Sequence, residues 1–200
     1  MYAPFPNETL HWLQKNNVHS IVGNTDRKVR KLLRGEDFKK PRKEEKRIMY
    51  TWTAEQLDLT AKKYILGLKK TKYISVEDKT IGLFHGSPDD PDEFLFPNMP
   101  QNRFATLAGS CPCDIILTGH SHTPFHKQIS NTHFINPGSI GRMFDSNPAA
   151  SCATLTIEDN QINPKFYRIL WPVDVTVAEL KKQKLPEIYQ TMFLVGRKLN

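Results

Sequence analysis

Four short apolar runs, each followed directly by glycine and polar residues, constrain the fold of this chain more than any other feature. The turns that close them are Gly23-Asn24-Thr25-Asp26, His85-Gly86, Gly119-His120-Ser121-His122 and Asn136-Pro137-Gly138-Ser139. Short apolar runs that end in glycine are typical of buried strands leading into loops. In open α/β sheets, sites are built at the ends of the strands. We therefore expect an α/β fold whose strand ends bring these turns together.

Three of these turns carry side chains that bind divalent metal ions. His120 and His122 are two residues apart, so in an extended segment both would point to the same side. A His-x-His pair framed by glycine, together with His85 after another strand, favours a metal site over isolated structural histidines. Asn24 alone is weaker evidence, because Asn and Asp are common in turns, where they bond to their own backbone. The pattern predicts a metal site assembled from distant segments of one chain.

Length and composition suit an α/β domain of this kind. The chain has 200 residues, of which 38% are hydrophobic, enough for one domain with its own core. No apolar run reaches the roughly 18 residues of a membrane span, and residues 1–6 lack the pattern of a signal peptide. Cys111 and Cys113 are too close for an ordinary disulfide, and the total of three cysteines is odd. Free thiols in a reducing compartment are therefore expected, which predicts a cytoplasmic protein without membrane association.

Positive charge is concentrated in one segment. Residues 27–47 contain eleven Lys or Arg and four Asp or Glu, a surplus of seven that equals the net charge of the whole chain, +7. Such a segment after the Asn24 turn would raise the local concentration of phosphate-bearing ligands. A solvated helix and loop is the alternative. Nucleotides or nucleic acid are compatible partners, although no aromatic residues interleave with these arginines for base stacking.

The sequence predicts helices and strands along a single domain of residues 1–200. Asn7 is predicted to cap a helix that extends to residue 17, and Thr53 to begin another through a capping box. A basic helix is expected after the Asn24 turn. Further helices are expected at residues 59–68, 102–108, 177–183 and 186–194, and strands at residues 20–22, 73–76, 80–84, 115–118, 132–135, 152–157 and 166–169.

Taken in order, the four turns resemble the motifs of the calcineurin-like metallophosphoesterase superfamily, especially its small single-domain bacterial and archaeal members. The family motifs read Gly-Asn-His-Asp with a variable third position, His-Gly after a strand, Gly-His-Thr/Ser-His-x-Pro and Asn-Pro-Gly-Ser. The similarity continues at residues 52–57 and 94–97 and covers nearly the whole chain. It implies an α/β fold, a four-layer sandwich of two mixed β-sheets flanked by helices.

The resemblance also implies a reaction and a set of ligands. It implies hydrolysis of a phosphomonoester or phosphodiester by a metal-activated water. Asn24, His85 and His120 would bind one divalent ion, and His122 would belong to a second. Asp26 would orient these ligands or the neighbouring backbone. Mn²⁺ is the expected ion, with Fe, Zn, Ni and Mg as alternatives.

Three further positions follow from the same resemblance. Thr25 stands where larger members have a histidine that donates a proton to the leaving group, and threonine is not a useful acid near neutral pH. Arg142 lies two positions before the arginine that the family often has, and is expected to bind a substrate phosphate, with a surface role as the alternative. Ser139 and its turn would support the loop that carries His120.

The family also has Asp-x-His and Gly-Asp motifs ahead of the Gly-Asn turn, and this chain does not contain them. We therefore expect a domain truncated at its N-terminus, without the first strands of the family fold, with impaired activity and with one bound ion or none. The missing strands would leave an open sheet edge, which a partner or an oligomer is expected to cover. A non-catalytic scaffold or interaction module on the same fold is the alternative function.

Overall fold

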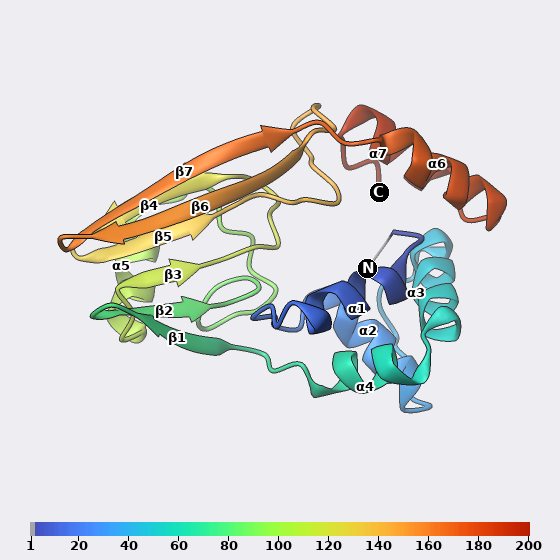
Figure 1. Cartoon of the computed structure of the whole chain (residues 1–200), viewed down its shortest axis with the longest axis horizontal. Coiled ribbons are helices and arrows are strands. Elements are labelled where there is room, and N and C mark those ends of the chain that lie inside the picture. Colours follow the sequence, from blue (N-terminus) through green and yellow to red (C-terminus); the bar gives the residue numbers. More distant parts are fainter. Residues whose placement is uncertain (1–2) are drawn as a thin grey trace.

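The computed structural model describes residues 3–200, which form two β-sheets beside two groups of helices (Figure 1). In chain order the elements are α1 (Pro6–Lys15), α2 (Asn24–Leu33), α3 (Glu44–Gln56), α4 (Leu59–Gly67), β1 (Lys72–Val76), β2 (Lys79–Leu83), α5 (Gln101–Ser110), β3 (Ile115–Leu117), β4 (Phe125–Ile129), β5 (Thr132–Asn136), β6 (Ala150–Glu158), β7 (Gln161–Ile169), α6 (Val173–Lys182) and α7 (Glu187–Val195). Within the described residues, every helix is too short or too polar to cross a membrane.

The larger sheet has five strands in the order β1-β2-β3-β5-β4. Its central strands β2, β3 and β5 are parallel to one another, whereas β1 and β4 pair antiparallel at the edges. Parallel neighbours end at the same edge of a sheet, so the residues that follow the three central strands lie side by side. The amide of Gly119, after β3, donates to the carbonyl oxygen of His85, after β2, at 3.0 Å. The strand ends therefore bring these turns together, as predicted.

Different elements cover the two faces of the larger sheet. On one face, Phe104 of α5 packs against Phe134 of β5, with ring centroids 5.0 Å apart. On the other face lies the antiparallel hairpin of β6 and β7, where Ile162 joins Ile81 and Ile135 in a second cluster. Successive side chains of a strand point to opposite faces, so the continuous apolar run of β3 serves both layers. The expected α/β fold, a mixed sheet and a smaller sheet flanked by helices, is confirmed.

The other helices form two groups at the edge where the central strands end (Figure 1). The first group, α1, α2 and α4, packs around Val29 and Ile65. The second group, α6 and α7, packs around Leu180. α3 belongs to both, because Tyr50 lies in the first cluster and Met49 in the second. This helix therefore fixes the two groups relative to each other.

Two helix-start predictions are wrong because capping residues act elsewhere. Asn7 does not cap α1: its side chain donates to the carbonyl oxygen of Gln56 at 2.8 Å and accepts from the amide of Asp58 at 3.0 Å. It therefore joins α1 to the turn between α3 and α4. Thr53 lies inside α3, where its buried hydroxyl donates to the carbonyl oxygen of Met49 at 2.7 Å. A Ser or Thr in a capping pattern can instead lie inside a helix, where its hydroxyl donates to the carbonyl oxygen one turn earlier.

Two strand predictions also differ from the structure. The strand expected at residues 20–22 is reduced to one parallel bridge between Ile21 and Lys69. Conversely, β4 was not expected, because its centre is polar. Its side chains at residues 126–128 alternate between exposed and half-buried at the edge of the sheet. Edge strands tolerate such polar residues, so the sequence of an edge strand can lack the apolar run that predicts a buried strand.

Candidate functional site

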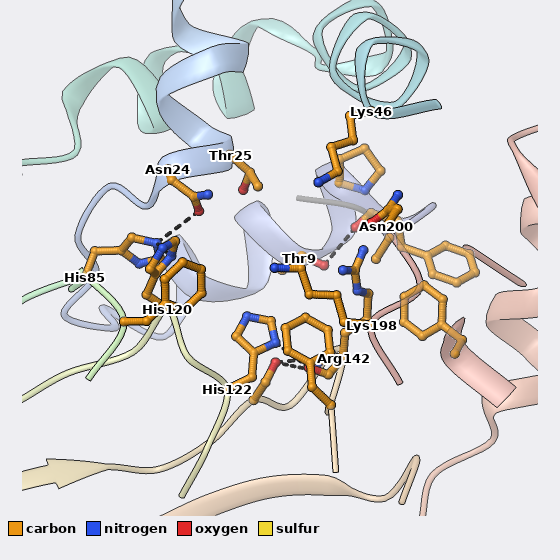
Figure 2. A pocket seen from close by; sticks show the side chains of 18 residues that line it. Thr9, Asn24, Thr25, Lys46, His85, His120, His122, Arg142, Lys198 and Asn200 are labelled. Carbon is orange, nitrogen blue, oxygen red and sulfur yellow. Dashed lines mark hydrogen bonds between the residues drawn. The ribbon is translucent and has the colours of Figure 1, made fainter. Parts of the chain in front are cut away.

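A pocket of about 350 Å³ lies where the strand ends meet the helices (Figure 2). Its walls come from α1, α2 and α3, from the loops after β2, β3 and β5, and from the segment after α7. The residues expected at the site, Asn24, His85, His120, His122 and Arg142, all line it. Five positions spread over 119 residues of sequence thus share one cavity.

Asn24, His85 and His120 converge on one side of this pocket. Asn24 Oδ1 lies 3.0 Å from His85 Nε2, which in turn lies 3.0 Å from His120 Nδ1. Ligand atoms bound to one ion at about 2.0–2.2 Å are themselves about 3 Å apart. Within residues 3–200 no three His, Cys, Asp or Glu side chains form a metal-binding group, so the third donor here is an amide. One amide oxygen and two imidazole nitrogens suit a divalent ion.

Burial keeps the two imidazoles of this group neutral. Burial, and after it the neighbouring His120, lowers the pKa of His85 to about 4. Burial also lowers the pKa of His120, and the positive charge of Lys198 acts in the same direction. Neutral imidazole is the form that binds a metal, since a protonated nitrogen has no free lone pair. Both rings are therefore in the ligand form at neutral pH.

The turn before α2 is shaped to bring Asn24 close to His85. A Cβ atom at Gly23 would lie 3.0 Å from His85 Cε1, so glycine allows the close approach. Asp26 Oδ2 accepts a hydrogen bond from the Gly23 amide at 2.8 Å and closes the turn at the N-terminus of α2. Asp26 thus lies against the backbone that carries Asn24.

The loop after β3 holds two histidines in strained conformations. His120 and His122 have φ values of 60° and 55°, in the left-handed region that L-residues other than glycine seldom occupy. The fully buried Asn136 holds this loop: its Nδ2 donates to the Gly119 carbonyl oxygen at 2.8 Å and to Ser121 Oγ at 3.0 Å. The sequence places Asn136 only in a turn; its position directly after an apolar strand is the signal that could have revealed this role.

His122 faces another part of the pocket. Its Nδ1 donates to the carbonyl oxygen of Arg142, and its ring stacks on Phe144 with centroids 4.4 Å apart. That hydrogen bond leaves Nε2 as the unprotonated nitrogen, and burial lowers the pKa of His122 to about 4. The extended conformation assumed for residues 120–122 is wrong, because both histidines are left-handed. The structure therefore brings Asn24, His85 and His120 together and leaves His122 apart from them.

Three cationic residues line the other side of the pocket. Lys46 comes from α3, Arg142 from the loop after β5, and Lys198 from the segment after α7. Figure 2 shows Lys46 and Arg142 away from the group of Asn24 and His85. The sequence indicated Arg142 but neither lysine: Lys46 is one of many basic residues in its segment, and Lys198 lies in no motif.

The chain is similar to one family of known proteins. Residues 5–160 match the model of the calcineurin-like phosphoesterase superfamily domain. The chain belongs to this superfamily. An uncharacterised protein of Methanocaldococcus jannaschii is 25% identical over 213 residues, which cover 98% of this chain and 83% of that protein. A probable metallophosphoesterase of the same organism is 27% identical over 96 residues, which cover 47% of this chain and 45% of that protein.

Two crystal structures share the fold of this superfamily member. A hypothetical protein of Pyrococcus horikoshii superposes with a TM-score of 0.83 at 20% identity, over 98% of this chain and 82% of the other. A metallophosphoesterase of Sphaerobacter thermophilus superposes with a TM-score of 0.77 at 23% identity, over 98% of this chain and 84% of the other. At such identities the likeness establishes the fold alone.

The basic segment of residues 27–47 divides between structural and pocket positions. Arg30 donates to the carbonyl oxygens of Leu66 and Leu68 at 3.0 Å each, so it holds the end of α4. Other basic residues line a second hollow that shares two residues with the first pocket. Its lining includes Arg27, Lys28, Lys40 and Arg42, and the shared residues are Asn24 and Lys46. Part of the basic segment is therefore adjacent to the candidate site.

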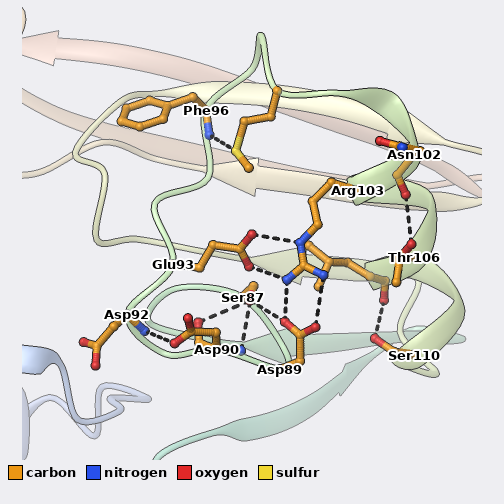
Figure 3. A network of polar contacts seen from close by, with 12 residues as sticks. Ser87, Asp89, Asp90, Asp92, Glu93, Phe96, Asn102, Arg103, Thr106 and Ser110 are labelled. Atoms are coloured by element: carbon orange, nitrogen blue, oxygen red, sulfur yellow. Dashed lines mark hydrogen bonds and ion pairs between the residues drawn. The ribbon is translucent and has the colours of Figure 1, made fainter.

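A network centred on Arg103 of α5 holds the loop between His85 and Phe94 (Figure 3). The guanidinium donates to both carboxylate oxygens of Asp89, at 2.8 and 3.1 Å, and to both of Glu93, at 2.6 and 2.8 Å. These hydrogen bonds hold the pKa of each carboxyl group below its ordinary value. The network therefore fixes a loop that begins at one pocket residue and ends at another.

Proposed function

We propose that this chain is a metal-dependent phosphoesterase in which Asn24, His85 and His120 hold one divalent ion. The observation that carries the proposal is the 3.0 Å spacing of their three donor atoms. Membership of the calcineurin-like phosphoesterase superfamily supports it. A divalent ion bound there would supply Lewis acidity toward a phosphoryl oxygen and lower the pKa of water. His122, whose Nε2 is unprotonated, is proposed to serve a second ion.

In the described part of the chain, the pocket offers no evident acid to protonate the leaving group. Hydrolysis adds water to phosphorus and breaks the phosphorus–oxygen bond, and an alcohol leaving group must take up a proton. Thr25 lines the pocket, but its hydroxyl is not an acid near neutral pH. A phenolate leaves without protonation more readily than an alkoxide. We therefore expect faster hydrolysis of aryl phosphates than of alkyl phosphates.

The test is hydrolysis of an aryl phosphate by the full chain, treated with a chelator and then supplied with Mn²⁺. We expect release of the phenol only with the metal, and a loss of roughly 100-fold or more in His120→Ala. His19→Ala is the control, because its exposed imidazole contacts Lys72 away from the pocket. The same assay with Fe²⁺, Zn²⁺, Ni²⁺ and Mg²⁺ ranks the metals. If circular dichroism shows that the sample is folded and no ion supports hydrolysis, the proposal is contradicted and an interaction module is favoured.

We also propose that the protein works in the cytoplasm. Its free thiols support this, since Cys111, Cys113 and Cys152 form no disulfide and the first two are buried. Reducing compartments keep cysteines in this state. Retention of activity at cytosolic glutathione concentrations, measured with the same aryl phosphate, is the expected result.

A further inference from the structure

We propose that Lys46, Arg142 and Lys198 form a second phosphate-binding position, and that the substrate carries two linked phosphoryl groups, as in a phosphoanhydride. The inference rests on the proposed function, because it names the substrate class of the same pocket. One phosphoryl group would lie beside Asn24, His85 and His120 and be transferred to water. The other would lie against the three cations.

Positive charge from three distant parts of the chain converges on one pocket. The three cations come from a helix, a turn and the segment after α7, which are far apart in sequence but line one pocket. Of the pocket-lining residues within the described chain, none has a carboxylate side chain. A concave surface with charge of one sign attracts the opposite charge, and phosphate is the anion that such clusters bind.

The cations of the pocket disturb one another. The pKa of the Lys46 ammonium is lowered, first by burial and then by the nearby charges of Lys198, Lys43 and Arg142, which outweigh the opposite effect of Glu45. Folding therefore brings like charges together against their mutual repulsion. A bound dianion reverses that repulsion, so the folded protein favours occupancy of this position.

Aromatic rings hold two of the three cations, Arg142 and Lys198, in place. The Arg142 guanidinium carbon lies 5.4 Å from the ring centroids of both Phe144 and Tyr189. Lys198 Nζ lies 5.2 Å from the ring centroid of Phe94. Such contacts orient long side chains and exclude water from one side of each charge. Less ordering is then left to occur on binding, which favours affinity.

One aromatic ring links the two positions. The ring of Phe94 packs on His120 with centroids 4.0 Å apart and lies against the Lys198 ammonium. A single aromatic ring therefore contacts both the donor side and the cationic side. A phosphoanhydride presents its two phosphoryl groups on either side of one bridging oxygen, and we propose that it places one group on each side of this ring.

The chemistry of the leaving group agrees with this substrate class. Water adds to the phosphorus on the donor side, the bond from that phosphorus to the bridging oxygen breaks, and its electron pair stays on the departing phosphate. The two protons of the water end on the phosphate products or in solvent. A phosphate can depart as an anion, so the lack of an acid at Thr25 is no obstacle. Lys46, Arg142 and Lys198 are placed to stabilise that anion.

The test is calorimetric titration of the full chain, with a chelator present, by inorganic pyrophosphate and by inorganic phosphate. We expect pyrophosphate to bind about tenfold more tightly or better, and Lys46→Gln and Lys198→Gln each to weaken it about tenfold. Lys43→Gln is the matched control: it removes the same charge next to Lys46, but from an exposed residue outside the pocket lining. Its pyrophosphate affinity is expected to change less than about twofold.

Two results would overturn the inference. One is equal affinity for pyrophosphate and phosphate, and the other is an equal loss in Lys43→Gln and Lys198→Gln. Because the titration needs no metal, it separates the two proposals. Hydrolysis of an aryl phosphate without a preference for pyrophosphate would contradict only this inference. A clear preference for pyrophosphate without hydrolysis of any phosphate would contradict only the proposed function. Melting curves of each variant confirm that it is folded.

Discussion

The two sides of the pocket are built in different ways. The donor side consists of short side chains on turns fixed by neighbouring strands and by α2, with 3.0 Å between successive donor atoms. The cationic side consists of long side chains from α3, a turn and the segment after α7. Two of them, Arg142 and Lys198, lie about 5 Å from the centroids of aromatic rings. Strand ends give precise geometry for chemistry, whereas segments outside the sheet are free to vary and set substrate preference. The difference is consistent with our proposal that one side carries the reaction and the other recognises the substrate.

The largest effect is expected from Asn136→Ala, which acts mainly on the donor side. Asn136 holds the strained His120 loop through two hydrogen bonds and is fully buried. Its loss leaves the Gly119 carbonyl oxygen without this donor, so the free energy of unfolding should fall by about 2–3 kcal/mol. Metal-dependent hydrolysis should fall about 10–100-fold because the ligand loop loses its orientation. Urea unfolding and the aryl phosphate assay measure the two effects.

Pyrophosphate affinity in the same variant shows whether the sides are separate. We expect it to change less than about threefold, since the hydrogen bonds of the Asn136 side chain go to Gly119, Ser121 and Gly138, not to a cationic side chain. Asn163→Ala, in an exposed position of β7, is the control for loss of an asparagine. If pyrophosphate binding fell as far as hydrolysis, the assignment of separate tasks to the two sides would be wrong.

The donor side was largely predictable from sequence, and the cationic side was not. Apolar runs and glycine-containing turns are local signals, and parallel pairing of β2, β3 and β5 makes their ends meet. Which lysine reaches the pocket depends on how α3 and the last segment pack, so Lys46 is indistinguishable from its basic neighbours in the sequence. The capping pattern failed at Asn7 for the same reason, because a tertiary contact with Gln56 took over its side chain. At Thr53 it failed for a local reason, because the hydroxyl donates to the Met49 carbonyl oxygen one turn earlier in the same helix.

An intermediate effect is expected from Arg103→Gln, which acts on the junction of the two sides. Arg103 fixes the loop that runs from His85 on the donor side to Phe94 beside Lys198. Loss of these partly exposed hydrogen bonds should lower the free energy of unfolding by about 1–2 kcal/mol at pH 7. Hydrolysis and pyrophosphate affinity should both fall several-fold. A loss confined to one of them would show that the loop positions that side alone.

The pH dependence of this variant has a definite sign. The pKa values of Asp89 and Glu93 lie below their ordinary 3.8 and 4.5, mainly because of their hydrogen bonds with Arg103. Their stabilisation is fully present above those ordinary values and is lost as pH falls through the lower folded-state values. The difference between wild type and Arg103→Gln in urea unfolding should therefore shrink below about pH 3. Lys182→Gln, in an exposed ion pair with Glu179, should show almost no difference at either pH.

The smallest effect is expected from salt, which distinguishes charged from neutral binding groups. Raising NaCl from about 0.05 M to about 0.5 M shortens the screening length from above 10 Å to about 4 Å. Pyrophosphate affinity should weaken about threefold to tenfold, because Lys198 is exposed and Lys46 half-buried. Mn²⁺ affinity, measured without substrate, should change less than about twofold, because a metal held by neutral ligands in contact is screened little. Lys198→Gln should have a shallower salt dependence for pyrophosphate and an unchanged one for Mn²⁺. Parallel salt dependences in all four titrations would mean that the two sides of the pocket share one electrostatic mechanism.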